Sequence, residues 1–169
     1  MVSRQVDRDR IHMRLFVLRR IALRGTYTLL LACRRPIKVK FGKLGLTKLE
    51  KGNYLYTGSA LGKGAVSLEQ RVARHRRRNK RVKWHVDYLT VHREIRVVNV
   101  ICIGVNKRLE CQINQQILAN LNGNPIIQRA GATDCKCSAH LLSVKLRDPK
   151  AVMRRLKQVY ATYGEPLFL

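Results

Sequence analysis

The sequence predicts an α/β fold of the α+β type, in which a small mixed sheet is flanked by helices. Short apolar, β-branched stretches alternate along the chain with stretches of helical periodicity. Hydrophobic residues make up 46% of the 169 positions, which is enough for one domain with its own core. We expect that domain at residues 25–146, between a basic, helical N-terminal extension (1–24) and a C-terminal helix and tail (147–169).

Five stretches have the composition of strands. Arg34-Arg35-Pro36 separates the first two, and Gly42, Gly45 and the segment Lys51-Gly52-Asn53 predict turns. The predicted strands are residues 26–33, 37–41, 54–57, 95–105 and 140–146.

Helices are predicted between these strands and at both ends of the chain. Ser67 is a suitable N-cap for one helix, and Asp148-Pro149 begins the last. The segment Asn122-Gly123-Asn124-Pro125 ends another. The predicted helices are a short amphipathic one in the extension, then residues 67–78, 84–91, 107–121 and 149–163. Residues 58–64 and 131–138 are predicted loops.

The charge balance indicates which class of molecule the protein binds. The chain has 35 Lys and Arg residues against 10 Asp and Glu, a formal net charge of +25. Self-repulsion at this charge disfavours the compact state, and a polyanion such as nucleic acid relieves it. The basic residues are spread along the chain, which argues against a membrane surface as the partner.

Other features indicate an intracellular, cytoplasmic protein. No apolar run approaches the roughly 18 residues of a membrane span, and arginines interrupt the apolar N-terminal stretch, unlike a secretory signal. Five cysteines are too few, and odd in number, for a disulfide framework.

Two predicted helices carry charged groups on their apolar faces. Leu68, Arg71, Val72 and His75 share one face at about 100° per residue. A partly buried arginine needs an anion, which is either a structural salt-bridge partner or a scissile phosphate. On the 107–121 helix, Glu110 shares the inward stripe. It either caps the helix or pairs with Arg71, or it is the single carboxylate of a Mg²⁺ site.

Two strand motifs resemble the signature of the GIY-YIG endonuclease domain. Gly25-Thr26-Tyr27 begins one strand, and Tyr56-Thr57-Gly58 ends another, with threonine in place of the middle isoleucine of each triad. The resemblance implies an active site at Tyr27, Tyr56, Arg71 and Glu110, and His75 matches a histidine common in that family. It implies that tyrosine hydroxyls orient or deprotonate water, arginine stabilises phosphorane charge and glutamate holds the metal.

The similarity extends to the basic GIY-YIG-like domains known mainly from archaea. It covers about residues 25–146. The segments that carry it are Gly42-Lys43-Leu44-Gly45, Trp84-His85-Val86-Asp87-Tyr88, Glu110-Cys111 and Asp134-Cys135-Lys136-Cys137-Ser138-Ala139-His140-Leu141.

Cys135, Cys137 and His140, together with Cys111, are residue types that bind zinc. The C-x-C spacing is tighter than the usual pair, and no second pair is evident. We therefore expect zinc to be an unlikely cofactor and these cysteines to be small buried hydrophobes.

The basic residues group in several clusters, whose charges are not mixed with acidic ones as on an ordinary solvated face. The densest follows the helix that carries Arg71. The residues predicted to contact nucleic acid are Arg4, Arg8, Arg10, Arg14, Arg19, Arg20, Lys38, Lys40, Lys63, Arg74, Arg76, Arg77, Arg78, Lys80, Arg81 and Lys83.

The sequence favours the first of two functions and leaves the second open as the alternative. A structural RNA-binding protein, associated with ribosomal RNA and neighbouring ribosomal proteins, is favoured by the amount and spread of positive charge. A Mg²⁺-dependent endonuclease that cuts DNA or structured RNA is favoured by Tyr27, Tyr56, Arg71 and Glu110. The sequence therefore leaves open whether the protein is an enzyme.

Overall fold

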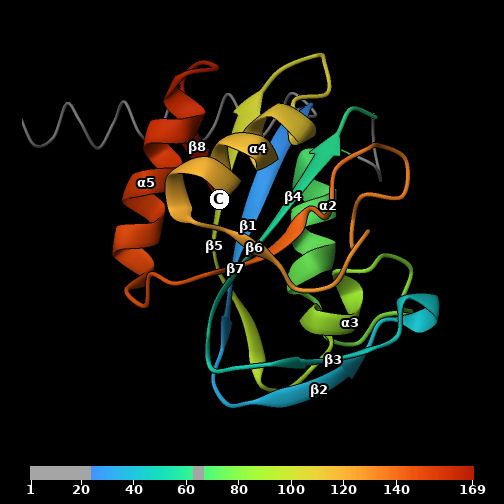
Figure 1. The fold of residues 1–169 in the computed structure, drawn as a ribbon. Helices are drawn as coiled ribbons and strands as arrows, with labels where there is room; N and C mark the ends of the chain where they lie inside the picture. The colour runs from blue at the N-terminus through green and yellow to red at the C-terminus, as the bar shows by residue number, and fades with distance from the viewer. Residues whose placement is uncertain (1–23, 63–66) are drawn as a thin grey trace, which may run out of the picture.

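The structure is a computed structural model that describes residues 24–62 and 67–169. In this part of the chain, a six-stranded sheet forms the centre. Its four longer strands are β1 (Gly25–Cys33), β4 (Gly52–Ala60), β5 (Ile95–Gly104) and β7 (Leu141–Val144). With β6 (Asn124–Pro125) and β8 (Leu167–Phe168) at the edges, the order is β6-β7-β4-β1-β5-β8 (Figure 1). The α+β class is confirmed, but these strand pairings are antiparallel, so the sheet is not mixed as predicted.

A separate hairpin joins β2 (Ile37–Lys40) to β3 (Leu46–Leu49) through the 3-10 turn η1 (Gly42–Leu44). The sequence predicted β2 and the turn, but not β3. The residues Leu46, Thr47, Lys48 and Leu49 do not alternate between apolar and polar, and four residues are too few for a reliable period.

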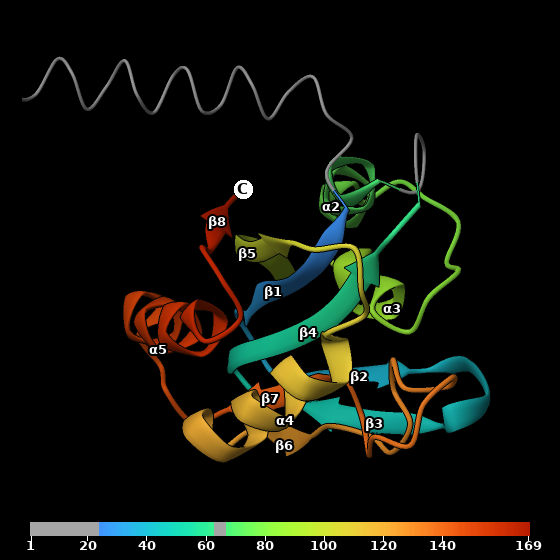
Figure 2. The same ribbon diagram turned by 90° about the horizontal axis from the view of Figure 1, so that it is seen from above.

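Within the described residues, four helices cover the sheet: α2 (Leu68–Arg76), α3 (Asp87–Thr90), α4 (Glu110–Leu121) and α5 (Pro149–Ala161). Both predicted N-caps are confirmed, since Ser67 accepts a hydrogen bond from the Gln70 N–H and Asp148 accepts two at the start of α5. Figure 2 shows α2 and α3 on one face of the sheet, and α4 and α5 on the other.

Strand β1 is buried on both faces and alternates between two cores. Tyr27, Leu29 and Leu31 pack against the side of α2 and α3. Leu30 packs against the side of α4 and α5. Because both faces are covered, the strand has the continuous apolar sequence that was used to predict it.

Several boundaries differ from the prediction. Strand β4 continues to Ala60, where a loop was predicted from Gly58, because the β1 pairing extends to Gly25 opposite Ala60. The loop that was predicted at residues 58–64 therefore begins later. Helix α3 has only one turn of the predicted 84–91 helix, and α4 starts at Glu110 rather than Lys107.

Among the described residues, no helix combines the length and the apolar character needed to cross a lipid bilayer. The predicted N-terminal helix of the basic extension, and Lys63, lie outside the described residues.

Candidate active site and metal centre

A pocket of ≈ 500 Å³ opens where β4, α2, the start of α4 and the loop before β7 meet. Strand β4 contributes Tyr56 to Ser59, and α2 contributes Arg71. Its other charged or aromatic lining residues include Lys83, Trp84, His85, Arg108, Glu110, Asp134 and His140. Three of the predicted active-site residues, Tyr56, Arg71 and Glu110, therefore line one pocket.

The other two predicted residues, Tyr27 and His75, lie buried beneath this pocket. The Tyr27 hydroxyl and the Nε2 atom of His75 are 2.8 Å apart, and the Tyr27 side chain is 0% exposed. The Tyr27 ring meets the Tyr56 ring edge-on at 6.4 Å. Tyr27 therefore does not itself line the pocket, and it contacts the pocket-lining residue Tyr56 instead.

Gly58 allows this arrangement. A Cβ atom at this position would lie 2.9 Å from the Tyr27 hydroxyl oxygen and 3.2 Å from the Tyr56 ring. Since real Cβ atoms do not approach so closely, a side chain here would displace one of the two tyrosines. The glycine of the second sequence motif therefore brings the β4 backbone against the Tyr27 hydroxyl.

Burial keeps these groups neutral. Burial, together with the neighbouring Tyr56, raises the pKa of Tyr27, although the Arg71 charge opposes this. Burial also raises the pKa of Tyr56, and the Glu110 charge adds to the effect. Burial, with the charge of Lys80, lowers the pKa of His75 to about 3. At neutral pH the tyrosines are phenols and His75 is an uncharged imidazole, and a hydrogen bond joins the Tyr27 hydroxyl to His75 Nε2.

Asp87 organises the charges on the other side of His75. It is 0% exposed, and its carboxylate accepts hydrogen bonds from Arg74 at 2.7 and 2.9 Å. Lys80 lies 3.3 Å away. Burial alone would raise the pKa of Asp87, but the hydrogen bonds from Arg74 and the backbone, with the charge of Lys80, lower it to about 2.

Arg71 is positioned for an external anion. Its side chain is half-buried, and its Nε atom has no hydrogen-bond partner among the described residues. The guanidinium group lies 5.0 Å from the centroid of the Trp84 ring. An arginine held against an aromatic face beside a pocket, with an unused buried N–H, is suited to bind phosphate.

Glu110 pairs with Arg108 rather than serving only as a helix cap. Arg108 Nε lies 3.8 Å from Glu110 Oε1, and Arg108 Nη2 lies 3.0 Å from Asp134 Oδ2. Glu110 is 7% exposed. Two carboxylates at one pocket fit Mg²⁺, which is commonly held by one or two carboxylates with water and substrate phosphate as further ligands.

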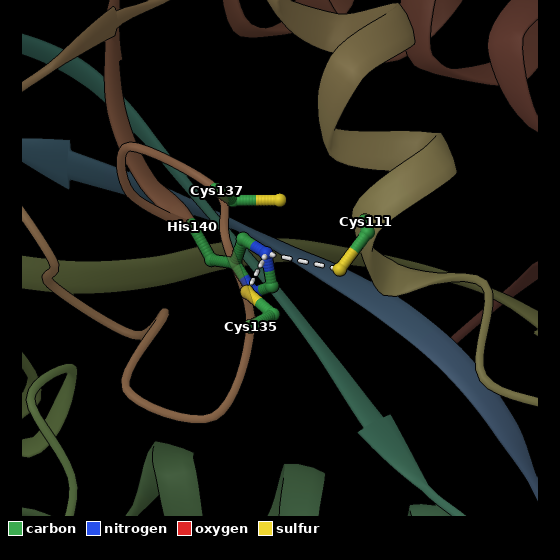
Figure 3. A group of neighbouring side chains, drawn as sticks. All are labelled: Cys111, Cys135, Cys137 and His140. Carbon is green, nitrogen blue, oxygen red and sulfur yellow. Dashed lines mark hydrogen bonds between the residues drawn. The ribbon is translucent and has the colours of Figure 1, made fainter.

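The cysteine cluster lies beside the same pocket. Figure 3 shows Cys111 of α4 facing Cys135, Cys137 and His140 of the loop before β7. The three Sγ atoms and one His140 nitrogen lie within 4.8 Å of one another, so the group could hold a metal ion. This argues against the prediction that zinc is an unlikely cofactor, because Cys111 supplies a ligand that the C-x-C spacing alone does not. The cysteines are half-buried rather than core residues.

Within the described residues, the predicted nucleic-acid contacts separate into two groups. Arg74 and Lys80 form ion pairs with buried Asp87, so the Asp87 carboxylate partly neutralises their positive charges. The exposed members are Lys38, Lys40, Arg76, Arg77, Arg78, Arg81 and Lys83. Arg4, Arg8, Arg10, Arg14, Arg19, Arg20 and Lys63 lie outside the described residues.

Sequence reasoning missed Arg108 and Asp134 as lining residues, and the central place of Asp87. The sequence did carry one signal for Asp134. It immediately precedes Cys135, just as Glu110 immediately precedes Cys111. Asp87 carried no such signal, because a single carboxylate in a basic chain has many possible partners.

No curated protein and no solved structure matches the chain. One family profile does match, described as a domain of unknown function, DUF123, over residues 26–163. This range includes the pocket, the Tyr27–His75 pair and the cysteine cluster. Because the match covers well over half of the chain, the protein belongs to the DUF123 family.

Proposed function

We propose that this protein binds nucleic acid and hydrolyses a phosphodiester bond at the pocket beside Tyr56. The observation that carries the proposal is the convergence of an arginine, a carboxylate and a tyrosine on one pocket, Arg71, Glu110 and Tyr56. They come from three separate elements and offer a cation for phosphate, a ligand for a metal ion and a hydroxyl that can orient water. The resemblance to the GIY-YIG endonuclease domain supports the same reaction.

Each residue has a distinct part in the proposed reaction. Arg71 binds the scissile phosphate and stabilises the charge that develops on it. Tyr56, which lines the pocket as a neutral phenol, orients the attacking water. Tyr27 and His75 form a positioning pair, since their hydrogen bond lies beneath the pocket and holds the Tyr56 ring from behind.

Glu110, with Asp134 opposite, would hold a Mg²⁺ ion. Such an ion supplies Lewis-acid stabilisation of phosphate oxygens. In the structure Arg108 bridges these two carboxylates, and its side chain is 61% exposed. Arg108 can therefore move away from them into solvent when a cation replaces its charge.

The test is cleavage of labelled DNA and structured RNA with and without Mg²⁺. We expect Glu110→Gln to lower the cleavage rate by at least about 100-fold while leaving nucleic-acid binding intact, because the amide keeps the shape but loses the charge. The matched control is Glu50→Gln, an exposed carboxylate paired with Lys48. Cleavage that survives in the Glu110 variant, or falls equally in the control, would contradict the proposal.

A structural role with ribosomal RNA is a second candidate, and the distribution of charge favours it. Exposed cations lie on β2, on the segment after α2 and on α5, which occupies the other face of the sheet from α2. Such a distribution fits a protein that contacts folded RNA on several sides, although it equally strengthens DNA binding.

Sedimentation of native lysate through a sucrose gradient distinguishes the two candidates. Stoichiometric migration with a ribosomal subunit at high salt would support the structural role. Recovery in the light fractions would exclude it and leave the hydrolytic proposal to the cleavage assay.

A further inference from the structure

We propose that Cys111, Cys135, Cys137 and His140 bind one zinc ion that fastens the loop at residues 126–140 to the first turn of α4. The four side chains come from two segments that no disulfide joins. They converge on a common centre in Figure 3.

Two distances between ligand atoms match the edge of a tetrahedral zinc site, and the remaining pairs lie within 4.8 Å. His140 Nε2 lies 3.5 Å from Cys135 Sγ and 3.8 Å from Cys111 Sγ. With Zn–S near 2.3 Å and Zn–N near 2.0–2.1 Å, the sulfur–nitrogen edge of a zinc tetrahedron is about 3.6 Å. The ion would therefore enter the cluster with little movement of the backbone.

The chemistry of the ligands selects the metal. Three thiolates and one imidazole form a closed set of soft and borderline ligands, which is typical of structural zinc and leaves no open position for catalysis. With three thiolates this site would carry net negative charge, which a chain of formal charge +25 favours. Cys33 and Cys102 are buried elsewhere and are not part of the cluster.

The surrounding structure holds the two loop cysteines for this purpose. Arg129 donates hydrogen bonds to the carbonyl oxygens of Cys135 at 2.6 Å and Cys137 at 3.2 Å. The Asn114 side chain on α4 donates to the Ala139 carbonyl at 2.8 Å. These contacts place positive charge and N–H groups beside the residues whose thiols must ionise to bind zinc.

The loop at residues 126–140 has no regular secondary structure of its own to hold it in place. Residues 126–140 contain turns and bends but no helix or strand. A loop of this length inside a compact domain is unusual unless it is functional or held by another constraint. A zinc ion bound to both the loop and α4 supplies that constraint in a protein whose cysteines are free.

The site also bears on the neighbouring pocket. Cys111 follows Glu110, and Cys135 follows Asp134, so the ion would set the separation of the two carboxylates at the pocket. This consequence rests on the proposed hydrolysis, whereas zinc binding itself does not.

The first test measures metal content in the full-length chain. After purification without chelators, or after refolding with excess zinc, we expect one zinc ion per chain by mass spectrometry. Replacement by Co²⁺ should give the strong visible absorption of a tetrahedral thiolate site. Cys135→Ser and Cys137→Ser should each reduce both signals. Cys33→Ser is the matched control, because serine can keep the hydrogen bond from residue 33 to the Arg35 carbonyl, and it should leave both signals unchanged.

A second readout detects the link itself. Removing zinc with a chelator should speed tryptic cleavage after exposed Lys136 and Arg129 in the wild-type protein. Adding zinc back should reverse this effect, but not in Cys137→Ser. The proposal would be overturned by any one of three results. These are a chain that contains no zinc after refolding in excess metal, a tryptic cleavage rate that chelation does not change, and a disulfide within the cluster in freshly purified protein. A zinc-replete protein without nuclease activity would contradict the hydrolytic proposal and leave the zinc site intact.

Discussion

Two buried tyrosines, one on each side of the sheet, make similar hydrogen bonds but have different surroundings. Tyr27 bonds His75 at 2.8 Å on the α2 side, and Tyr160 bonds Thr28 at 2.8 Å on the α5 side. Burial raises the pKa of both phenols. Thr28 also bonds Thr57, so the Tyr160 contact ends in a closed group of hydroxyls.

The hydrogen bond of Tyr27 instead leads to a charged group, because its partner His75 lies next to the Asp87 carboxylate. His75 lies next to Asp87, with Nδ1 and Oδ1 3.9 Å apart, and Tyr27 packs against Tyr56 at the pocket. The comparison teaches that the length and burial of a hydrogen bond do not indicate a site. What distinguishes the α2 side is that its buried polar groups reach both a pocket and a fixed charge.

The largest effect on stability is expected from Asp87→Asn. The substitution keeps the shape of the side chain but leaves Arg74 and Lys80 without their shared anion. We expect it to lower the free energy of unfolding by about 3–5 kcal/mol, measured by urea denaturation. Arg34→Gln, which breaks the ion pair between a 54% exposed arginine and Glu94, should cost less than about 1 kcal/mol. Equal costs for the two variants would show that the Asp87 charges are not coupled to folding.

The tyrosine pair gives a smaller but more selective effect. Tyr27→Phe and Tyr160→Phe each remove one buried hydroxyl and should each lower the free energy of unfolding by about 1–3 kcal/mol. In the proposed hydrolysis, only Tyr27→Phe should also lower kcat, by roughly 10-fold with little change in KM, because it alone loosens the Tyr56 position. Equal loss of kcat in both variants would remove the distinction between the two sides of the sheet.

The third effect appears only under acid conditions, in the pH dependence of stability. The folded-state pKa of His75 is about 3, below its ordinary value of 6.5, so the unfolded chain binds the proton more readily. Its contribution is therefore complete above pH 6.5 and is lost as pH falls toward 3. Asp87, with a pKa of about 2 against an ordinary 3.8, adds a loss only below pH 3.8.

His75→Gln should therefore lose less stability than wild type between pH 6.5 and 3.8, measured by urea denaturation at a series of pH values. His92→Gln is the control, since that imidazole accepts a bond from the Glu94 N–H outside the network. A variant profile parallel to that of wild type would show that His75 is not the group responsible.

Local patterns were sufficient for much of the fold. The strands β1 and β5 and the N-caps Ser67 and Asp148 depend on composition and on neighbours in the chain, and the structure has them where they were predicted. Edge strands β6 and β8 were missed because two residues carry no periodicity. The position of Glu110 on an inward helical face was likewise predictable, since 3.6-residue periodicity is a local property.

The sequence by itself therefore determined the excess of positive charge, the main strands and helices, and the residue types available for chemistry. Only the tertiary structure decided which of them meet. It placed Cys111 beside His140, 29 positions away, and paired Arg74 and Lys80 with Asp87 rather than leaving them on the surface. It also placed Tyr56 at the pocket and Tyr27 beneath it. The physical reason is that pairing between distant segments depends on sheet register and helix packing, which no local pattern specifies.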